Sequence, residues 1–578
     1  MLYSAPLDEL RFWLTSCYQD VRYQNASAFD QFDLEQAHAV LNEAANFAER
    51  QLAPLNVLGD RQGAQWRDGE ITLPSQFHQA YQRFCEQGWP TLRAQAAQGG
   101  MQVPQLLASL IEELWCSANL SFRLAPMLSR SAVEAITLRG NAFLKTHVLP
   151  KLVTGEWTGT MNLTEPQAGS DVGAIKTKVV QDGTGYWLKG QKCYITYGEH
   201  TLTPNIVHLI LARVEGAAPG TKGLSLFVVP KYRLSPLGEM QQRNDVRCLS
   251  IERKMGLHAS PTCVMSYGES DGSKGAQAFI VGQEGEGMEI MFIMMNLARL
   301  AVGIEGHALG ERALQMAQRY ASQRVQGRVF AKSKSHAIES HPDVKRMLLE
   351  MDARVQAARA LAVYAASEWD GIEAQGGDGR VDREARLGLL IPMVKAFGTE
   401  TGSWVASLNI QVHGGMGYIE DTGAAQLYRD ARIGAIYEGT NGIQALDYLT
   451  RKVLRDEGRA LASLIDDMQA DVTKLRKTQL SPEAHQSLVE AIELLRSSSQ
   501  TMRDRANREL EAALSLAVPF LMLSSLTVAG WRLARAMGVE AYLTAPETFQ
   551  QRKLTAAETF LRHSLAEAWG LARRITLG

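Results

Sequence analysis

One carboxylate of the chain lies in a setting that could make it a strong base. Glu438 follows an aromatic residue, Tyr437, and precedes Gly439 and a hydroxyl residue, Thr440. Removing a carboxylate from water raises its pKa toward neutral pH, where it can accept a proton. Glycine also lets the backbone approach a ligand closely. A surface Glu in a helix-capping turn would have the same local sequence, so other stretches must decide.

A second stretch, from Met161 to Asp171, leaves a predicted strand and enters a glycine-containing loop. It offers backbone N–H groups, the hydroxyls of Thr164 and Ser170, and a carboxylate. These groups could hydrogen-bond the edge of a polar planar ring and, near Ser170, a diphosphate. An ordinary Asx-type turn has a similar composition, and this alternative stays open.

Two further stretches could contribute to the same ligand site. Tyr194 and Thr196 are two residues apart in a predicted strand, so a ring and a hydroxyl would lie on one face, although a plain cross-strand aromatic is an alternative. Residues 411–418 form a helix end that enters a glycine-rich turn. Capping alone explains one glycine there, and the additional glycines suggest close approach of a ligand such as a diphosphate.

The elements that position these residues follow from hydrophobic periodicity. We expect an N-terminal arm over 1–33, a helical domain over 34–159, a β domain over 160–282, a helical bundle over 283–456 and an additional helical domain over 457–578. Helices are expected near 8–17, at 105–118, 288–323, from 341, at 386–412 and 445–454, with a break near 481–482. A hairpin is expected at 186–195, and strands at 206–214, 224–230, 246–252 and 263–267. The fold class is therefore α+β, mainly α.

Residues 512–531 contain no charge and are long enough to cross a membrane. The run contains a proline, a glycine and four hydroxyl residues. We interpret it as a buried bundle helix, since helices that are apolar all round are often core helices. Membrane contact is the alternative.

Composition excludes several classes of function. The 578 residues include 60 Lys and Arg and 62 Asp and Glu, a balance that disfavours nucleic acid as a partner. The six cysteines are scattered without a Cys-x-x-Cys pair, which predicts no metal site and no disulfide framework and fits a reducing compartment. The first twenty residues lack the apolar core of a secretory signal. We therefore expect a cytoplasmic protein.

Taken together, the motifs resemble the acyl-CoA dehydrogenase family. The matching segments occur in the family's order over roughly residues 40–455: Leu163–Pro166, Gly169–Asp171, Tyr194–Thr196, Ile251–Gly256, Arg299, Tyr320–Arg324, Gln411–Gly417 and Tyr437–Thr440. The resemblance implies a helical, β and helical core with FAD bound between domains and subunits. The N-terminal arm and the extra C-terminal domain resemble the longer bacterial subgroup that includes 3-methylthiopropanoyl-CoA dehydrogenase.

The resemblance implies a role for individual residues. Glu438 corresponds to the catalytic base. In one branch of the family the base is on another helix, as a Glu at the position of Arg299; this chain has Arg there and follows the majority of the family. Gly442 departs from the pattern, since many relatives carry Gln there, which weakens one adenosine contact. The implied flavin-contacting positions are Met161, Leu163, Thr164, Gly169, Ser170, Tyr194 and Thr196. The implied FAD adenosine and diphosphate positions are Arg324, Gln411, Gly414, Gly415 and Thr440, with Arg324 and Gln411 serving a neighbouring subunit. The implied substrate-binding positions are Ser170, Asn296, Arg299, Tyr437 and Gly439.

The resemblance further implies α,β-dehydrogenation of an acyl-CoA to a trans-2-enoyl-CoA, as in fatty acid β-oxidation. Glu438 would take the α-proton, and electrons would pass from FAD to an electron-transfer flavoprotein. Because the extra domain would cover the surface used for a second dimerisation, we expect a homodimer. Two alternatives stay open: an acyl-CoA oxidase that uses oxygen, and a DNA-associated flavoprotein of the alkylation-response type. The acyl group cannot be named from the sequence.

Overall fold

The structure is a computed structural model, and it describes the chain except residues 1–2, 21–31, 184, 329–334 and 375–377. Most of the predicted N-terminal arm between its helix and residue 33 therefore lies outside the described residues. The chain divides into two compact units. The sheet unit comprises residues 50–102 and 119–298, and the helical unit comprises residues 2–49, 103–118 and 299–578.

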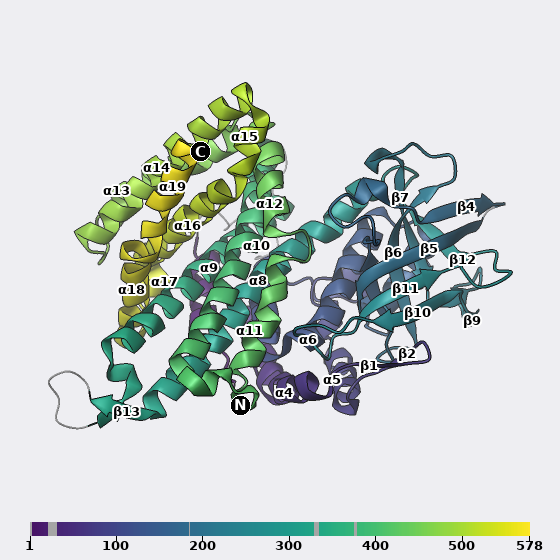
Figure 1. Ribbon diagram of the computed structural model, residues 1–578, viewed down its shortest axis with the longest axis horizontal. Helices are drawn as coiled ribbons and strands as arrows, with labels where there is room; N and C mark the ends of the chain where they lie inside the picture. The colour runs from purple at the N-terminus through teal and green to yellow at the C-terminus, as the bar shows by residue number, and fades with distance from the viewer. Residues whose placement is uncertain (1–2, 21–31, 184, 329–334, 375–377) are drawn as a thin grey trace. The chain divides into compact units, whose positions relative to one another are not determined.

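The sheet unit is built on an eight-stranded sheet (Figure 1). Its strands are β3 (Trp157–Asn162), β4 (Lys178–Asp182), β5 (Gly185–Thr196), β6 (Asn205–Val214), β7 (Leu224–Pro230), β10 (Val246–Ile251), β11 (Thr262–Tyr267) and β12 (Ala276–Val281). Two small pairs are β1 (Gln65–Arg67) with β2 (Glu70–Thr72) and β8 (Tyr232–Leu234) with β9 (Met240–Arg243). Among the strand pairs of the described residues, β3–β6 and β4–β6 alone are parallel. The long strand β5 pairs with β4, β11 and β12. It therefore joins the β10–β11 pair to the strands β12, β7, β6 and β3.

The predicted hairpin at 186–195 is wrong, because this stretch is the inside of the single strand β5. Gly190 within this strand serves packing: its φ is +150°, and an added Cβ would lie 2.6 Å from the Thr177 hydroxyl. The other four predicted strands are present as β6, β7, β10 and β11. Strands β3, β4 and β12 were not predicted.

The helices of the sheet unit are α4 (Ala53–Gln62), α5 (Ser75–Glu86), α7 (Leu149–Val153) and the second half of α6 (Gln105–Arg139). The predicted helix at 105–118 is the first half of α6. It ends at Asn119, whose φ of −161° and ψ of 92° are not helical. The continuation from residue 120 was not predicted.

The helical unit contains α1 (Leu7–Tyr18), α3 (Leu34–Phe47), most of α8 (Gly287–Gln323), α9 (Pro342–Ala374) and α10 (Asp378–His413). A short pair, β13 (Val325–Arg328) with β14 (Ser335–Ala337), follows α8. Then come α11 (Ala424–Arg432), α12 (Asn441–Asp447), α13 (Arg459–Leu475), α14 (Pro482–Arg508), α15 (Leu510–Ser515), α16 (Ala517–Arg535), α17 (Glu540–Leu543), α18 (Glu547–Arg562) and α19 (Glu567–Leu577). α10 begins at residue 378, earlier than the predicted 386.

The uncharged run is a buried helix, as expected, although Leu516 divides it between α15 and α16. Helices α8 and α16 are both long and apolar enough to cross a membrane, but 89% of the apolar window of α16 is buried. α16 contacts α9 and α10 (Figure 1). The Trp531 ring meets Tyr364 of α9 edge-on at 5.6 Å, and the Tyr448 hydroxyl donates to Ser524 at 2.9 Å. The C-terminal helices therefore pack on the bundle of their own chain.

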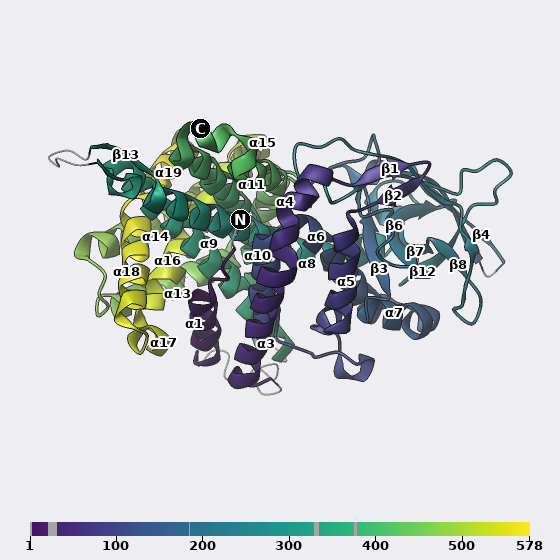
Figure 2. The same cartoon turned by 90° about the horizontal axis from the view of Figure 1, so that it is seen from below.

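Helix α1 is fixed by a cluster of buried charges. It contacts α3, α9 and α17, and Figure 2 shows it beside α3. Glu9 of α1 pairs with Lys553 of α18. Arg359 of α9 lies 4.0 Å from Glu9, 2.6 Å from Glu113 and 2.9 Å from Glu311. Because breaking a buried ion pair is costly, this cluster joins the two ends of the chain to the bundle.

Candidate functional site

The sheet unit brings two of the predicted ligand-binding stretches together. Cys193 of β5 donates its backbone N–H to the Thr164 carbonyl at 3.0 Å, and Lys192 Nζ donates to the Leu163 carbonyl at 3.0 Å. Leu163 and Thr164 therefore lie directly beside the strand that carries Tyr194. This adjacency agrees with the expectation that the two stretches contribute to one ligand site.

Glu165 holds this loop in place. Its carboxylate accepts hydrogen bonds from the backbone N–H groups of Lys176 and Thr177 at 2.7 and 3.1 Å and from the Thr177 hydroxyl at 2.6 Å. Lys192 Nζ lies 2.8 Å from Glu165 and is fully buried. Burial opposes ionisation, but Lys192 and these hydrogen bonds outweigh it and hold the pKa of Glu165 well below its usual range. The loop is therefore rigid where it meets β5.

The surface around this loop has the groups that a planar ring requires. Tyr194 adopts a φ of +60° and is 63% exposed, and Thr196 is half-buried beyond the buried Ile195. Ser170 is exposed, and nothing lies within 4 Å of a Cβ added at Gly169. Met161 at the end of β3 is 9% exposed. The open backbone, hydroxyl groups and aromatic ring fit the isoalloxazine ring of a flavin.

The predicted base lies in the helical unit, in a turn with unusual backbone geometry. Glu438 has a φ of +56° and Gly439 a φ of +88°. The left-handed region costs a non-glycine residue about 1–2 kcal/mol, so surrounding contacts must hold this turn. Gln444 Nε2 donates to the carbonyls of Glu438 and Gly439 at 3.2 and 3.3 Å, and Arg299 Nε donates to the Glu438 carbonyl at 3.4 Å.

The turn also caps a helix, but Glu438 is not the capping residue. The Thr440 hydroxyl accepts a hydrogen bond from the Ile443 N–H at 3.2 Å and is the N-cap of α12. Glu438 precedes the cap by two residues. Its carboxylate is therefore available for chemistry, whereas the Thr440 hydroxyl is already used locally.

Charges from two helices, α8 and α10, act on the Glu438 carboxylate. Burial is the largest effect and raises the pKa of Glu438. The positive charges of Arg299 and Lys395 lower it, and the negative charge of Glu305 raises it. The resulting pKa is about 7. Arg299 is 4% exposed and lies 3.6 Å from Asp447 of α12. At neutral pH Glu438 is thus poised between its protonated and ionised forms.

Sequence reasoning missed two residues of this site, Glu305 and Lys395. Lys395 of α10 is fully buried and donates to the Asn441 side-chain oxygen at 2.9 Å. Burial lowers its pKa to about 8, although Glu438 opposes this shift. A signal was present, because Lys395 is the only charged residue between Arg386 and Glu400. A lone charge in an apolar helix is rarely tolerated unless it has a partner.

The glycine-rich turn forms a separate patch of the helical unit. The Tyr320 ring stacks on His413 at 4.2 Å, so the ends of α8 and α10 lie side by side, and Arg324 and Gln411 next to these rings are both exposed. Gly414 has a φ of +60°, and Gly415 has nothing within 4 Å of an added Cβ. Gly417 instead serves packing, since its Cβ would lie 2.3 Å from the Ile410 carbonyl oxygen.

The predicted site residues are distributed over both units of the chain. Ser170 and Asn296 belong to the sheet unit, while Arg299, Tyr437 and Gly439 belong to the helical unit. Arg299 and Arg324 are 25 positions apart on or directly after α8, which is about 37 Å along a helix. The predicted CoA position and the predicted FAD adenosine position are therefore far apart along this helix.

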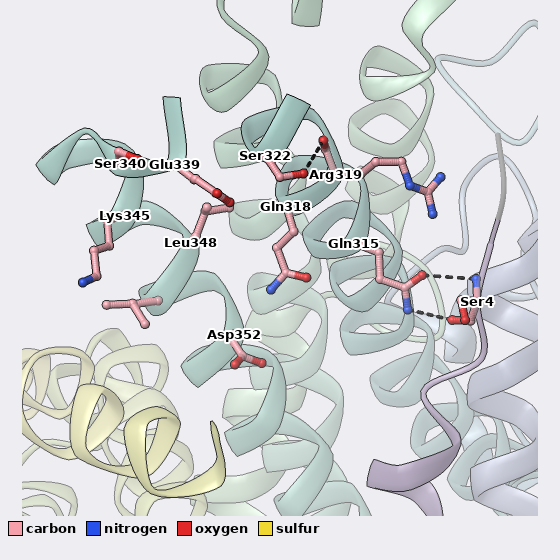
Figure 3. Close-up of a pocket in the computed structure, with 11 residues that line it drawn as sticks. Ser4, Gln315, Gln318, Arg319, Ser322, Glu339, Ser340, Lys345, Leu348 and Asp352 are labelled. Atoms are coloured by element: carbon pink, nitrogen blue, oxygen red, sulfur yellow. Dashed lines mark hydrogen bonds between the residues drawn. The ribbon is translucent and has the colours of Figure 1, made fainter. Parts of the chain in front are cut away.

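A hollow of about 910 Å³ lies elsewhere on the helical unit (Figure 3). It is lined by polar side chains of α8 and α9, among them Arg319, Lys345 and Asp352, and by Ser4, which exchanges hydrogen bonds with Gln315. None of the predicted site residues lines it. It is therefore not the predicted site.

Family models cover nearly all of the chain. Those described as acyl-CoA dehydrogenase N-terminal, middle and C-terminal domains match residues 35–156, 160–270 and 285–453. The model described as acetyl-CoA dehydrogenase C-terminal like matches residues 461–578.

Curated relatives match over nearly their whole length. The chain is 41% identical to a 3-methylmercaptopropionyl-CoA dehydrogenase of Ruegeria pomeroyi, over 100% of this chain and 98% of that protein. It is 33% identical to a broad-specificity linear acyl-CoA dehydrogenase of Mycobacterium tuberculosis, over 93% of this chain and 91% of that protein. It is 34% identical to a butyryl-CoA dehydrogenase of Syntrophomonas wolfei, over 87% and 86%.

Solved structures share the fold. An acyl-CoA dehydrogenase from Bacillus anthracis complexed with FAD matches with a TM-score of 0.76 and 22% identity, over 93% of this chain and 88% of that chain. A Caenorhabditis elegans protein, ACDH-11 in complex with C11-CoA, matches with a TM-score of 0.74 and 20% identity, over 94% and 91%.

Proposed function

Because this chain belongs to the acyl-CoA dehydrogenase family and is an FAD-dependent oxidoreductase, we propose that Glu438 is its catalytic base. Glu438 removes the α-proton of an acyl-CoA thioester, and the product is a trans-2-enoyl-CoA. The observation that carries this proposal is the combination at Glu438 of a left-handed backbone and a pKa raised to about 7. A base works best when its pKa lies near the working pH.

The residues around Glu438 have distinct tasks in this proposal. Arg299 and Gln444 hold the turn through its carbonyl groups, so the carboxylate is pre-positioned. The backbone N–H of Glu438 donates to the thioester oxygen and stabilises the charge that develops as the α-proton leaves. Bound FAD supplies the acceptor for the β-hydrogen, which departs as hydride. The predicted contact of Arg299 with CoA stays a prediction, since its guanidinium is buried here.

FAD would be held by the chain in two places. Leu163, Thr164, Tyr194 and Thr196 offer a surface for the ring, and Ser170 and Gly169 offer exposed donors beside it. The second patch, Arg324, Gln411, Gly414 and Gly415, would hold the diphosphate of a neighbouring subunit's cofactor. Arg324 lies about 37 Å from Arg299 along the helix, which supports an FAD site shared between two subunits. Thr440 is the weakest of the proposed FAD contacts, because its hydroxyl caps α12.

Substitution of the base tests the proposal. Glu438→Gln preserves side-chain size but cannot accept the α-proton, so anaerobic flavin reduction by acyl-CoA should fall by about three orders of magnitude. FAD content and acyl-CoA binding should be unchanged. Glu384→Gln, an exposed change on α10, is the matched control. Near-normal flavin reduction in Glu438→Gln would place the base elsewhere.

For the acyl group, we propose a short chain that carries a thioether, because the relative at 41% identity is named for such a substrate. An anaerobic flavin-bleaching screen should compare 3-methylmercaptopropionyl-CoA, butyryl-CoA and longer linear acyl-CoAs. Fastest bleaching by a long linear chain would contradict the proposal. Peroxide production under air would instead indicate an oxidase.

We also propose that electrons leave through an electron-transfer flavoprotein, and that the enzyme is a cytoplasmic homodimer. The six cysteines support a reducing compartment, because all are free thiols in the described chain. The packing of α16 and its neighbours on α9 and α10 supports the dimer, because these helices occupy a face of the bundle that a second dimerisation would need.

A further inference from the structure

Two helices beside the base touch through their backbones. A Cβ added at Gly306 of α8 would lie 2.1 Å from the carbonyl oxygen of Gly398 of α10. One added at Gly398 would lie 2.1 Å from the carbonyl oxygen of Gly303, and one at Gly402 would lie 2.3 Å from that of Gly306. No larger side chain fits at this crossing. Residues next to these glycines are therefore held in fixed positions.

Glu305 lies at this crossing, between Gly303 and Gly306, and is 1% exposed. Its carboxylate accepts a hydrogen bond from the Tyr437 hydroxyl. Tyr437 directly precedes Glu438, so this bond fixes the residue that leads into the strained turn. Glu305 is thus a second carboxylate at the base, anchored to a rigid part of the fold.

Glu305 acts within a defined set of charges. Arg299 and Glu305 face Glu438 from α8, and Lys395 faces it from α10. Further out, Asp447 lies 3.6 Å from Arg299, Arg451 lies 3.3 Å from Asp447, and Glu400 accepts from Asn441 at 2.8 Å. Among the three charges that face Glu438 directly, Glu305 is the one that disfavours its ionised form.

We propose that Glu305 is a positioning residue for the base: it holds the Tyr437 ring by a hydrogen bond and keeps a second negative charge beside the Glu438 carboxylate. The hydrogen bond fixes the entry into the turn, and the charge makes Glu438 a stronger base than Arg299 and Lys395 alone would allow. This inference rests on the proposed function of Glu438.

Two variants separate the charge from the hydrogen bond. Glu305→Gln removes the charge but keeps an oxygen that can accept from Tyr437, while Tyr437→Phe removes the donor and leaves the charge. Glu289→Gln is the matched control, because Glu289 is an exposed residue of α8 about 24 Å away along the helix.

The first measurement does not depend on activity. The infrared carbonyl band of a protonated carboxyl is followed against pH in purified holoenzyme, and its loss in Glu438→Gln assigns it. We expect a midpoint near pH 7 in the native protein and the control. In Glu305→Gln the midpoint should fall by about one pH unit, because a neighbouring negative charge has gone. An unchanged midpoint in Glu305→Gln would overturn the electrostatic part.

The second measurement is anaerobic flavin reduction by one acyl-CoA that bleaches the native enzyme. In Tyr437→Phe the rate of flavin reduction should be about tenfold lower at every pH. In Glu305→Gln the acid limb of the rate–pH profile should move to lower pH, by the same amount as the infrared midpoint. Native rates in Tyr437→Phe would overturn the positioning part. If Glu438→Gln retains full flavin reduction, the proposed base is wrong, whatever the infrared titration shows for Glu305.

Discussion

At the scale of single residues, the base illustrates how a weak acid becomes useful near neutral pH. A Glu in water would be almost fully ionised at pH 7 and a poor proton acceptor. Burial raises the pKa of Glu438. The positive charges of Arg299 and Lys395 limit this rise, so that the pKa is about 7. Because the protonated form cannot accept a proton, kcat/KM should fall as pH drops below about 7.

Lys395 offers the sharpest test of this balance. Lys395→Met removes a buried cation that favours ionised Glu438, so the pKa of Glu438 should rise and the acid limb of kcat/KM should move up by about one pH unit. The measurement is flavin reduction against pH, with the exposed Lys477→Met as control. A limb that stays in place would mean that Lys395 does not act on the base.

At the scale of elements, side-chain contacts fix the loop after β3, which lacks the regular hydrogen bonds of a helix or strand. Glu165 and Lys192 form a buried pair that ties the loop after β3 to β5. The glycine contacts between α8 and α10 do the same for the base. In both places fixed contacts lie next to a proposed functional group, which is what a preorganised site requires.

Breaking the buried pair should loosen the cofactor. Glu165→Gln leaves the Lys192 ammonium buried without its carboxylate, a change that costs roughly 3–5 kcal/mol. We expect purified Glu165→Gln to retain less FAD than the native protein and to bind added FAD at least tenfold more weakly, measured by flavin fluorescence. Glu156→Gln, whose side chain is 53% exposed, is the control. Native FAD content in Glu165→Gln would show that the clamp is not needed for binding.

At the scale of the whole molecule, the two ends of the chain are part of the bundle rather than attachments to it. Glu9 of α1 and Lys553 of α18 meet beside Arg359 of α9. Helix α16 lies against α9 and α10. The C-terminal helices thereby cover apolar surface of the bundle of their own chain.

Light scattering coupled to gel filtration should therefore give the mass of two chains. The reason is that α16 and its neighbours cover one face of the bundle, while the proposed roles of Arg324 and Gln411 place them on a partner's cofactor. A mass of four chains would show that the C-terminal helices leave the second face free. A monomer that retains FAD would contradict the shared cofactor site.

The sequence by itself determined the local elements and the family. Long helices such as α8 and α9 were predictable because their apolar residues repeat every three or four positions, and four strands were predictable from composition and turns. The motifs around Glu438 indicated the family, FAD and the α+β fold, which the family models and relatives confirm. The division into five segments and the roles of the individual site residues stay predictions.

Only the tertiary structure decided which distant residues surround the base. Glu305 and Lys395 are 133 and 43 positions from Glu438, and nothing in their local sequence says that they face it. The hairpin predicted at 186–195 was wrong because the local sequence does not show whether a glycine such as Gly190 permits a bend or a close contact. Packing brings such residues together, and the pKa of Glu438 depends on the charges that packing places around it.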